Sequence, residues 1–101
     1  MTVNTMVSDG TKTVTVFGEI NTLTTPELAK YMADLQGISR LIIDMENVSY
    51  ISSAGLRLFL SSLRTVSAAG GEFLVRNCSE FVMEIFESVG YHRILHLERK
   101  Q

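Results

Sequence analysis

Short strand-like runs alternate with amphipathic helical segments along this chain, and that alternation restricts the fold more than any other feature. Residues 2–7 and 11–17 form two strand patterns around the turn-forming residues Ser8, Asp9 and Gly10. Three segments with apolar side chains at helical spacing follow, separated by short apolar runs typical of buried strands. The predicted order is therefore two strands followed by three helix–strand units.

Capping residues and glycines mark the ends of the predicted helices. Thr25 fits the N-cap of the first helix, with Pro26 at the first helical position, and Gly37 ends that helix. Serines precede the second and third helices, and glycines follow both. The predicted helices are residues 25–37, 52–70 and 79–90, the strands after them are residues 41–43, 73–75 and 94–97, and residues 18–21 are predicted as a loop.

Strands that alternate with helices form a parallel sheet through right-handed crossovers. The opening hairpin adds one antiparallel strand at the edge of that sheet. A length of 101 residues with 46% apolar and 20% charged residues is typical of one globular domain. We therefore predict an α/β fold: a single domain over residues 1–101, with a mostly parallel central sheet, an antiparallel N-terminal edge strand and about three helices.

Charge and residue content exclude several classes of function. The formal net charge is -2, and the nine lysines and arginines form no basic stripe, which argues against nucleic-acid binding. The single Cys78 allows neither an internal disulfide nor a thiolate zinc cluster. His92 and His96 have no completing carboxylate pattern, so no metal site is predicted. No phosphate-binding glycine loop or Gly-x-Ser-x-Gly elbow is present, and we predict no catalytic residue and no cofactor.

Neither a membrane span nor a secretion signal is visible in the sequence. No apolar run approaches the ~20 residues that a bilayer requires, which predicts no direct membrane insertion. Residues 1–10 lack a basic region followed by an apolar stretch, so no signal peptide is predicted. Together with the sparse cysteine content, this favours a cytoplasmic location.

The junction between residues 44 and 56 is the strongest candidate for a functional site. It connects a buried strand, through a predicted loop, to a helix that starts at Ser52 and Ser53. In α/β folds, sites lie where strands end and helices begin. The first turn of a helix has unpaired N–H groups and a partial positive charge, which stabilise a phosphate. A serine at this place fits a phosphorylation site or, as the simpler alternative, an N-cap without further function.

Residues 50–57, Tyr-Ile-Ser-Ser-Ala-Gly-Leu-Arg, resemble the phosphorylation-loop motif of the STAS family, specifically of the anti-sigma-factor antagonists. The surrounding sequence is also similar to that family. Residues 18–21 and 25–28 resemble its segment after the second strand, and residues 41–45 resemble its central strand. Residues 77–95 are similar to its third helix and last strand. The resemblance covers almost the whole chain.

The resemblance implies that Ser53 is the phosphoacceptor, because the alignment on Gly55 and Leu56 places it there. Ser52 then stands where the family usually has Asp, and Asn21 stands where it often has Asp before the first helix. Without those two carboxylates the site is less acidic than is usual in the family. The implied partner-binding residues are Asn21, Ser52, Ser53, Ala54, Gly55, Leu56 and Arg57. Arg57 and Arg64 fit ordinary solvated surface or, as the alternative, a pairing with an acidic partner.

The function that this resemblance implies is partner switching. The unmodified protein binds a serine kinase that is also an anti-sigma factor, phosphorylation of Ser53 ends the binding, and a serine phosphatase restores it. We expect a monomer or weak dimer. Two alternatives remain open: an accessory subunit of a membrane transporter ATPase, and, less favoured, a catalytic protein that uses Ser53.

Overall fold

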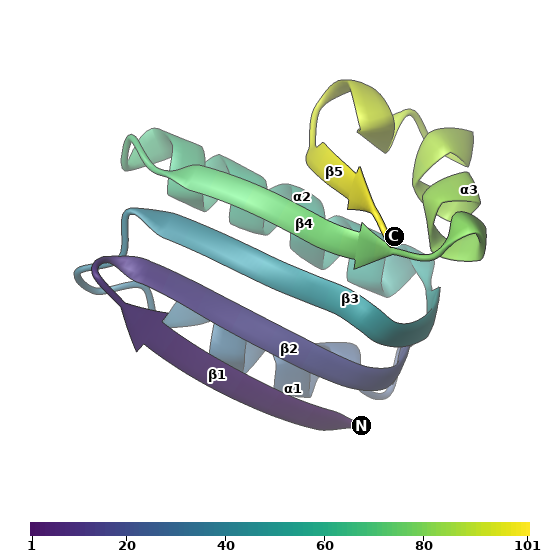
Figure 1. Ribbon diagram of the computed structural model, residues 1–101, viewed down its shortest axis with the longest axis horizontal. Helices are drawn as coiled ribbons and strands as arrows, with labels where there is room; N and C mark the ends of the chain where they lie inside the picture. The colour runs from purple at the N-terminus through teal and green to yellow at the C-terminus, as the bar shows by residue number, and fades with distance from the viewer.

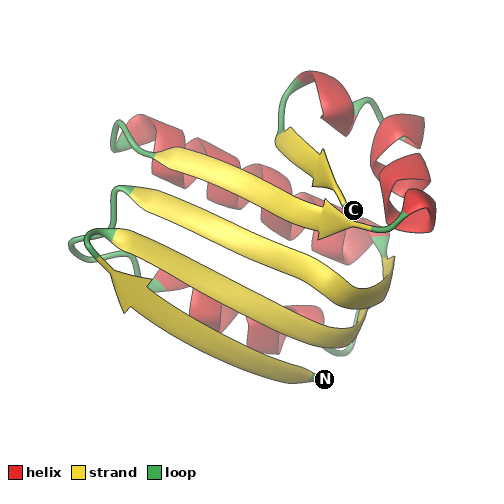
Figure 2. Cartoon of the chain, in the orientation of Figure 1, coloured by secondary structure: helices red, strands yellow, loops and turns green.

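A computed structural model describes residues 1–101 as one sheet with its helices packed on one face (Figure 1). Figure 2 shows how strands and helices alternate along the chain. The strands are β1 (Thr2–Ser8), β2 (Thr11–Ile20), β3 (Arg40–Ile51), β4 (Glu72–Cys78) and β5 (His96–Arg99). The helices are α1 (Thr25–Ala33), α2 (Ser53–Ala68) and α3 (Glu80–Ser88), and a 3-10 turn, η1, spans Tyr91–Arg93.

The five strands follow one another in the sheet in the order β1-β2-β3-β4-β5. β1 and β2 are antiparallel, and the other three pairs are parallel. Asp9 and Gly10 connect β1 to β2 with positive φ angles of 50° and 78°, the conformation that a tight hairpin requires. The predicted fold class is thus confirmed: a mostly parallel sheet, an antiparallel N-terminal edge strand and three helices.

The core lies between the sheet and its helices. Alternate side chains of the three central strands face the helices, and those of Val14, Ile43 and Val75 are fully buried. Phe59 of α2 joins this layer to α3, because its ring lies 5.9 Å from that of Phe86 between centroids. Both aromatic side chains are completely buried. The helices therefore have a fixed position relative to the ends of the strands.

Strands β2, β3 and β4 are longer than the sequence pattern predicts, and β4 spans Glu72–Cys78 rather than residues 73–75. β3 continues to Ile51, although only residues 41–43 were predicted as strand, and β2 continues to Ile20 through the predicted loop at residues 18–21. The pairing explains the difference. β2 and β3 stay hydrogen-bonded past two register shifts, so that Ile20 finally lies opposite Ile51. No loop separates β3 from α2.

Helix boundaries and the start of the last strand differ from the prediction as well; α2 and α3 are each shorter than predicted, by one residue at the start and two at the end. The first helix ends at Ala33 rather than Gly37, because the backbone of Asp34 is extended (φ -84°, ψ 90°). Its N-cap position is held by Thr24 rather than Thr25, and the Thr24 side chain does not cap the helix. The last strand begins at His96 rather than residue 94, since η1 occupies residues 91–93.

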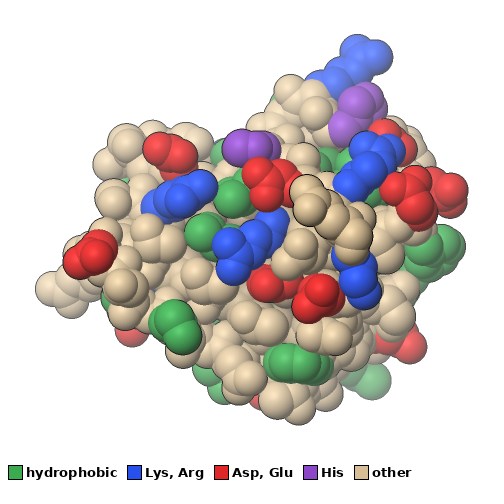
Figure 3. All heavy atoms as spheres, in the orientation of Figure 1, with side chains coloured by type: hydrophobic (Ala, Val, Ile, Leu, Met, Phe, Trp, Pro, Cys, Tyr) green, Lys and Arg blue, Asp and Glu red, His purple; other side chains and the backbone are tan.

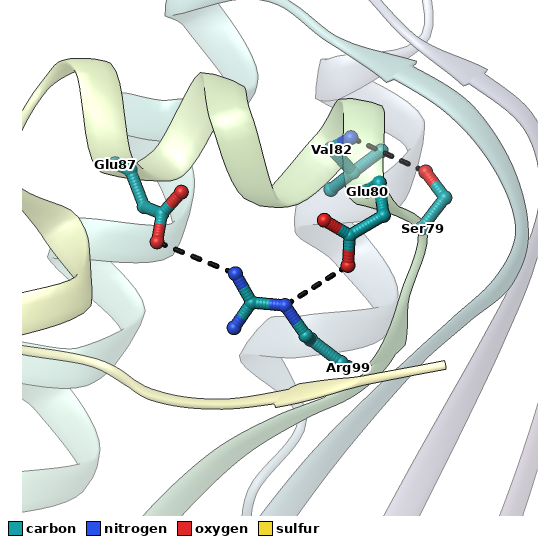
Figure 4. Close-up of polar contacts among 5 residues, drawn as sticks. All are labelled: Ser79, Glu80, Val82, Glu87 and Arg99. Atoms are coloured by element: carbon teal, nitrogen blue, oxygen red, sulfur yellow. Dashed lines mark hydrogen bonds and ion pairs between the residues drawn. The ribbon is translucent and has the colours of Figure 1, made fainter. Parts of the chain in front are cut away.

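The C-terminal strand is attached to α3 by charged side chains (Figure 4). The Ser79 Oγ caps α3 by accepting a hydrogen bond from the Val82 N–H at 3.2 Å, as the sequence predicted. On β5, the Arg99 guanidinium donates to Glu80 at 2.9 Å and lies 3.5 Å from Glu87. β5 is therefore joined to the helix that precedes it as well as to β4.

No helix in the structure combines the length and the hydropathy needed to cross a membrane. No group of His, Cys, Asp and Glu side chains has the geometry to hold a metal ion.

Candidate functional site

The candidate site lies where β2 and β3 end side by side. Ile20 and Ile51 are opposite each other in the parallel pair, and the Ser52 N–H donates to the Ile20 carbonyl at 2.8 Å. The chain then leaves β2 through Asn21 and leaves β3 directly into α2. Two segments that are distant in the sequence are thereby brought together, as their resemblance to one family's site implied.

Ser52 is the N-cap of α2. Its backbone is extended (φ -86°, ψ 174°), and its Oγ accepts a hydrogen bond from the Gly55 N–H at 3.4 Å. Its carbonyl accepts the Leu56 N–H at 2.9 Å, the first hydrogen bond of the helix. Ser52 is buried, with 9% of its surface exposed. Its hydroxyl is therefore engaged in starting the helix.

Ser53 is the first residue of α2 and is exposed to solvent. Because Ser52 supplies the cap, the Ser53 hydroxyl is not needed to start the helix. The first turn of α2 contains no acidic residue, so the positive end of the helix dipole is not neutralised there. A phosphate on Ser53 would meet free backbone N–H groups and no neighbouring carboxylate in that turn.

Gly55 allows α2 to start directly against the sheet. A Cβ at this position would lie 2.7 Å from Ile20 Cγ2 and 2.7 Å from Ile51 Cγ1, which is closer than carbon atoms pack. Leu56 follows it into the core, with 7% of its surface exposed. The Leu56 carbonyl accepts a hydrogen bond from the Tyr91 hydroxyl at 3.0 Å. The first turn of α2 thus packs against the sheet at Gly55 and is hydrogen-bonded to η1 through Tyr91.

Asn21 organises the loop that leads from β2 to α1. Its side-chain oxygen accepts hydrogen bonds from the backbone N–H groups of Leu23 at 2.9 Å and Thr24 at 3.0 Å. Its own N–H donates to the Thr24 Oγ1 at 2.9 Å, and its carbonyl accepts the Thr25 N–H. This is an Asx turn, which shapes the loop without using a formal charge.

Arg57 extends the exposed surface one helical turn beyond Ser53. It is exposed, and neither Arg57 nor Arg64 takes part in any of the ion pairs of the chain. Residues at a spacing of three or four share one face of a helix. The outer face of α2 therefore presents a hydroxyl and unpaired positive charges.

The structure divides the predicted site residues into two groups. All of them lie at the same end of the sheet, but their exposure differs. The side chains open to solvent are suited to contact a partner, and the buried ones position them. Ser53 and Arg57 are exposed, Asn21 and Ala54 are half-buried, and Ser52, Gly55 and Leu56 are buried.

Two exposed apolar side chains near this site were not anticipated. Leu23, in the Asn21 loop, has 89% of its surface exposed, and Tyr50, near the end of β3, has 39%. In a sequence a surface leucine cannot be told from a core leucine. A prediction that the strand continues to Ile51 would have identified Tyr50 as an outward-facing position before Ser52.

A five-stranded mixed sheet, three helices and an exposed serine at the start of the second helix define the class of STAS-like α/β domains. The STAS domain family model matches residues 2–100, and the chain belongs to this family.

Several of the proteins that this chain resembles are anti-sigma factor antagonists. The anti-sigma-B factor antagonist of Staphylococcus aureus is 28% identical over 99 residues, which cover 96% of this chain and 92% of that protein. The crystal structure of an anti-sigma factor antagonist from Mycobacterium paratuberculosis has a TM-score of 0.86 at 23% identity, with 96% of this chain and 84% of that chain covered. The anti-sigma factor antagonist SpoIIAA in its unphosphorylated form has a TM-score of 0.76 at 19% identity, with 95% and 86% covered. The two solved structures share the fold of this chain.

Proposed function

We propose that this chain is an anti-sigma-factor antagonist controlled by phosphorylation of Ser53. In its unmodified form it binds a serine kinase that is also an anti-sigma factor, and this binding releases the sigma factor. Phosphorylation by the kinase ends the binding, and a serine phosphatase restores it. The observation that carries the proposal is the exposure of Ser53 at the first position of α2, with its neighbour Ser52 as the cap.

A phosphate at this position changes binding without a change of fold. It adds about -1.5 to -2 charges at one surface point, beside helix N–H groups that accommodate an anion. If this point lies at the centre of an interface, the loss of several kcal/mol corresponds to a decrease in affinity of 10- to 1,000-fold. The partner, rather than the domain itself, responds to the modification.

The proposed contact surface follows from the exposure of the site residues. Ser53, Ala54 and Arg57 would touch the partner from α2, and the Asn21 loop would add its neighbour Leu23. Burial of an exposed apolar side chain such as Leu23 would contribute to the binding energy, whereas exposed charges mainly provide specificity and a faster association. Ser52, Gly55 and Leu56 would act by positioning this surface.

The absence of carboxylates at Asn21 and Ser52 is compatible with the same mechanism. Ser52 caps the helix through its hydroxyl, and Asn21 shapes the loop through its amide oxygen, so neither role requires a charge. An unpaired Arg57 one turn beyond Ser53 makes this surface complementary to an acidic partner. We therefore expect recognition here to depend more on Arg57 than on acidic side chains next to the phosphoacceptor.

The proposal is tested by a pull-down from a lysate of the source cell with Ser53→Ala and Ser53→Glu as baits. Ser67→Glu, at the opposite end of α2 and exposed, controls for the added charge. We expect an ATP-binding serine kinase to bind the wild type, Ser53→Ala and Ser67→Glu, and to bind Ser53→Glu at least 10-fold less. With the captured kinase and ATP, Ser53→Ala should take up no phosphate.

Two results would contradict this proposal. Equal phosphate incorporation into Ser53→Ala and the wild type would place the modification elsewhere. Capture of the same ATP-hydrolysing transporter subunit by both Ser53 variants would favour the accessory-subunit function instead.

A further inference from the structure

β1 is an edge strand without the features that normally prevent edge-to-edge pairing. It pairs with β2 over all seven residues with no register shift, so it contains no bulge. Its sequence, Thr-Val-Asn-Thr-Met-Val-Ser, has no charged residue and no proline. Met6 and Val7 have 70% and 61% of their surfaces exposed. Natural edge strands usually carry charges, prolines or bulges, because a regular apolar edge pairs with other strands.

The opposite edge of the same sheet is protected. β5 has four residues, among them His96, Glu98 and Arg99, and its pairing with β4 contains a register shift. Arg99 is also held by Glu80 and Glu87 of α3 (Figure 4). In Figure 3 the charged side chains of the uncovered sheet face gather over β3 to β5, while the region along β1 is largely uncharged. The unprotected edge is thus a specific property of β1.

The sequence of β1 is complementary to itself in the antiparallel direction. If a two-fold axis normal to the sheet passes at Thr5, then Val3 lies opposite Val7 of the second copy, Asn4 opposite Met6, and Thr5 opposite Thr5. Each pair keeps its side chains on one face, since Val3, Thr5 and Val7 lie on the helix side of the sheet. This centre uses all seven residues, and any other centre uses fewer. β-branched pairs and Thr–Thr pairs are favourable across strands.

We infer that β1 is the interface of a homodimer, in which two copies join through antiparallel β1–β1 pairing into one continuous sheet. The occupant is a second copy because the edge carries no charge that would repel itself, and because its residues match in the two-fold register. The pairing would bury the exposed Val7 against Val3 of the other copy. A single pair of short strands is small compared with the ~1,200–2,000 Å² of stable interfaces, so dimerisation depends on concentration.

The dimer would leave the Ser53 surface of each copy free. β1 is the outermost strand, and β2 separates it from β3 and the start of α2 (Figure 1). The inference is therefore independent of the proposed function, and either can fail without the other.

Sedimentation velocity at protein concentrations from about 10 µM to about 1 mM tests the inference. We expect the wild type to shift from monomer to dimer within this range, and Thr5→Lys to stay monomeric because two lysines would lie directly opposite each other. Gln36→Lys, an exposed substitution with the same charge change, should dimerise like the wild type. Circular dichroism and urea unfolding would verify that Thr5→Lys is folded. A wild type that stays monomeric throughout, or a folded Thr5→Lys that dimerises normally, would overturn the inference.

Disulfide trapping tests the register. Thr5→Cys should give a covalent dimer with diamide as oxidant, because the two introduced thiols face each other on the axis. Ser8→Cys lies opposite Thr2 in this register and should give little covalent dimer. The native Cys78 is buried and stays out of the reaction. Equal cross-linking of Thr5→Cys and Ser8→Cys would rule out a dimer centred on Thr5.

Discussion

At the scale of single residues, the site depends on the absence of one side chain. Gly55 lets the first turn of α2 rest against Ile20 and Ile51, and a methyl group there would approach both to 2.7 Å. Ser52 and Ser53 also have different roles at the start of α2. Ser52 has the extended backbone of an N-cap, whereas Ser53 is the first helical residue and is exposed.

Gly55→Ala is expected to lower the free energy of unfolding by about 1–3 kcal/mol, because overpacking forces α2 away from the sheet. Urea unfolding measures this change. Ser67→Ala, exposed near the end of the same helix, should stay within about 0.5 kcal/mol of the wild type. A Gly55→Ala protein as stable as the wild type would mean that the two isoleucines make room, and that the close approach of α2 is not required.

Cys78 predicts a pH dependence of stability. Burial raises the pKa of its thiol from the ordinary value of 9.0 to about 12. The folded state therefore favours the protonated thiol, and its contribution to stability, complete below pH 9, is lost as the pH rises toward 12.

We expect the urea midpoint of the wild type to fall more steeply than that of Cys78→Ala between about pH 8 and about pH 10.5. The two proteins differ at this one side chain, so the difference between the two curves reports the thiol. Parallel curves would contradict the assignment. In the folded wild type, a thiol reagent at neutral pH should label Cys78 only as fast as the protein unfolds.

At the scale of elements, the sequence predicted the order of strands and helices but not where β2 and β3 end. Asp44, Glu46 and Asn47 interrupt any alternation of apolar side chains, so this part of β3 has no strand pattern. It is a strand because Asn47–Ile51 continues to pair with β2 across two register shifts, which is a long-range effect. For the same reason the sequence placed both serines at the start of the helix without showing which one is the cap.

β5 is attached to α3 by ion pairs between exposed side chains (Figure 4). Ion pairs of this kind stabilise a fold only weakly. We expect Arg99→Gln to change the free energy of unfolding only slightly but to increase local opening of β5. Hydrogen exchange at Lys100 detects this, since its N–H donates to the Cys78 carbonyl at 2.8 Å. Arg93→Gln, exposed and outside the ion pairs, is the matched control. Unchanged exchange in Arg99→Gln would show that β4 alone holds β5.

At the scale of the whole molecule, the surfaces with proposed functions are separate from the core. The Ser53 surface lies at the end of β3, the β1 edge lies two strands away, and one layer of buried residues connects them. We therefore expect a charge added at Ser53 to change what the surface binds and not how the chain folds. This separation between binding and stability can be measured directly.

Ser53→Glu should unfold at a free energy equal to that of the wild type or up to about 1 kcal/mol higher, because an anion at the first position of α2 complements the helix dipole. Ser67→Glu places the same charge in the last turn and should be destabilised by a similar amount. Salt at about 1 M should remove most of the difference, since both side chains are exposed. If Ser53→Glu binds the kinase weakly at full stability, phosphorylation acts through the surface. If it instead loses more than about 2 kcal/mol, the negative charge disrupts the start of α2, and loss of structure would explain the loss of binding.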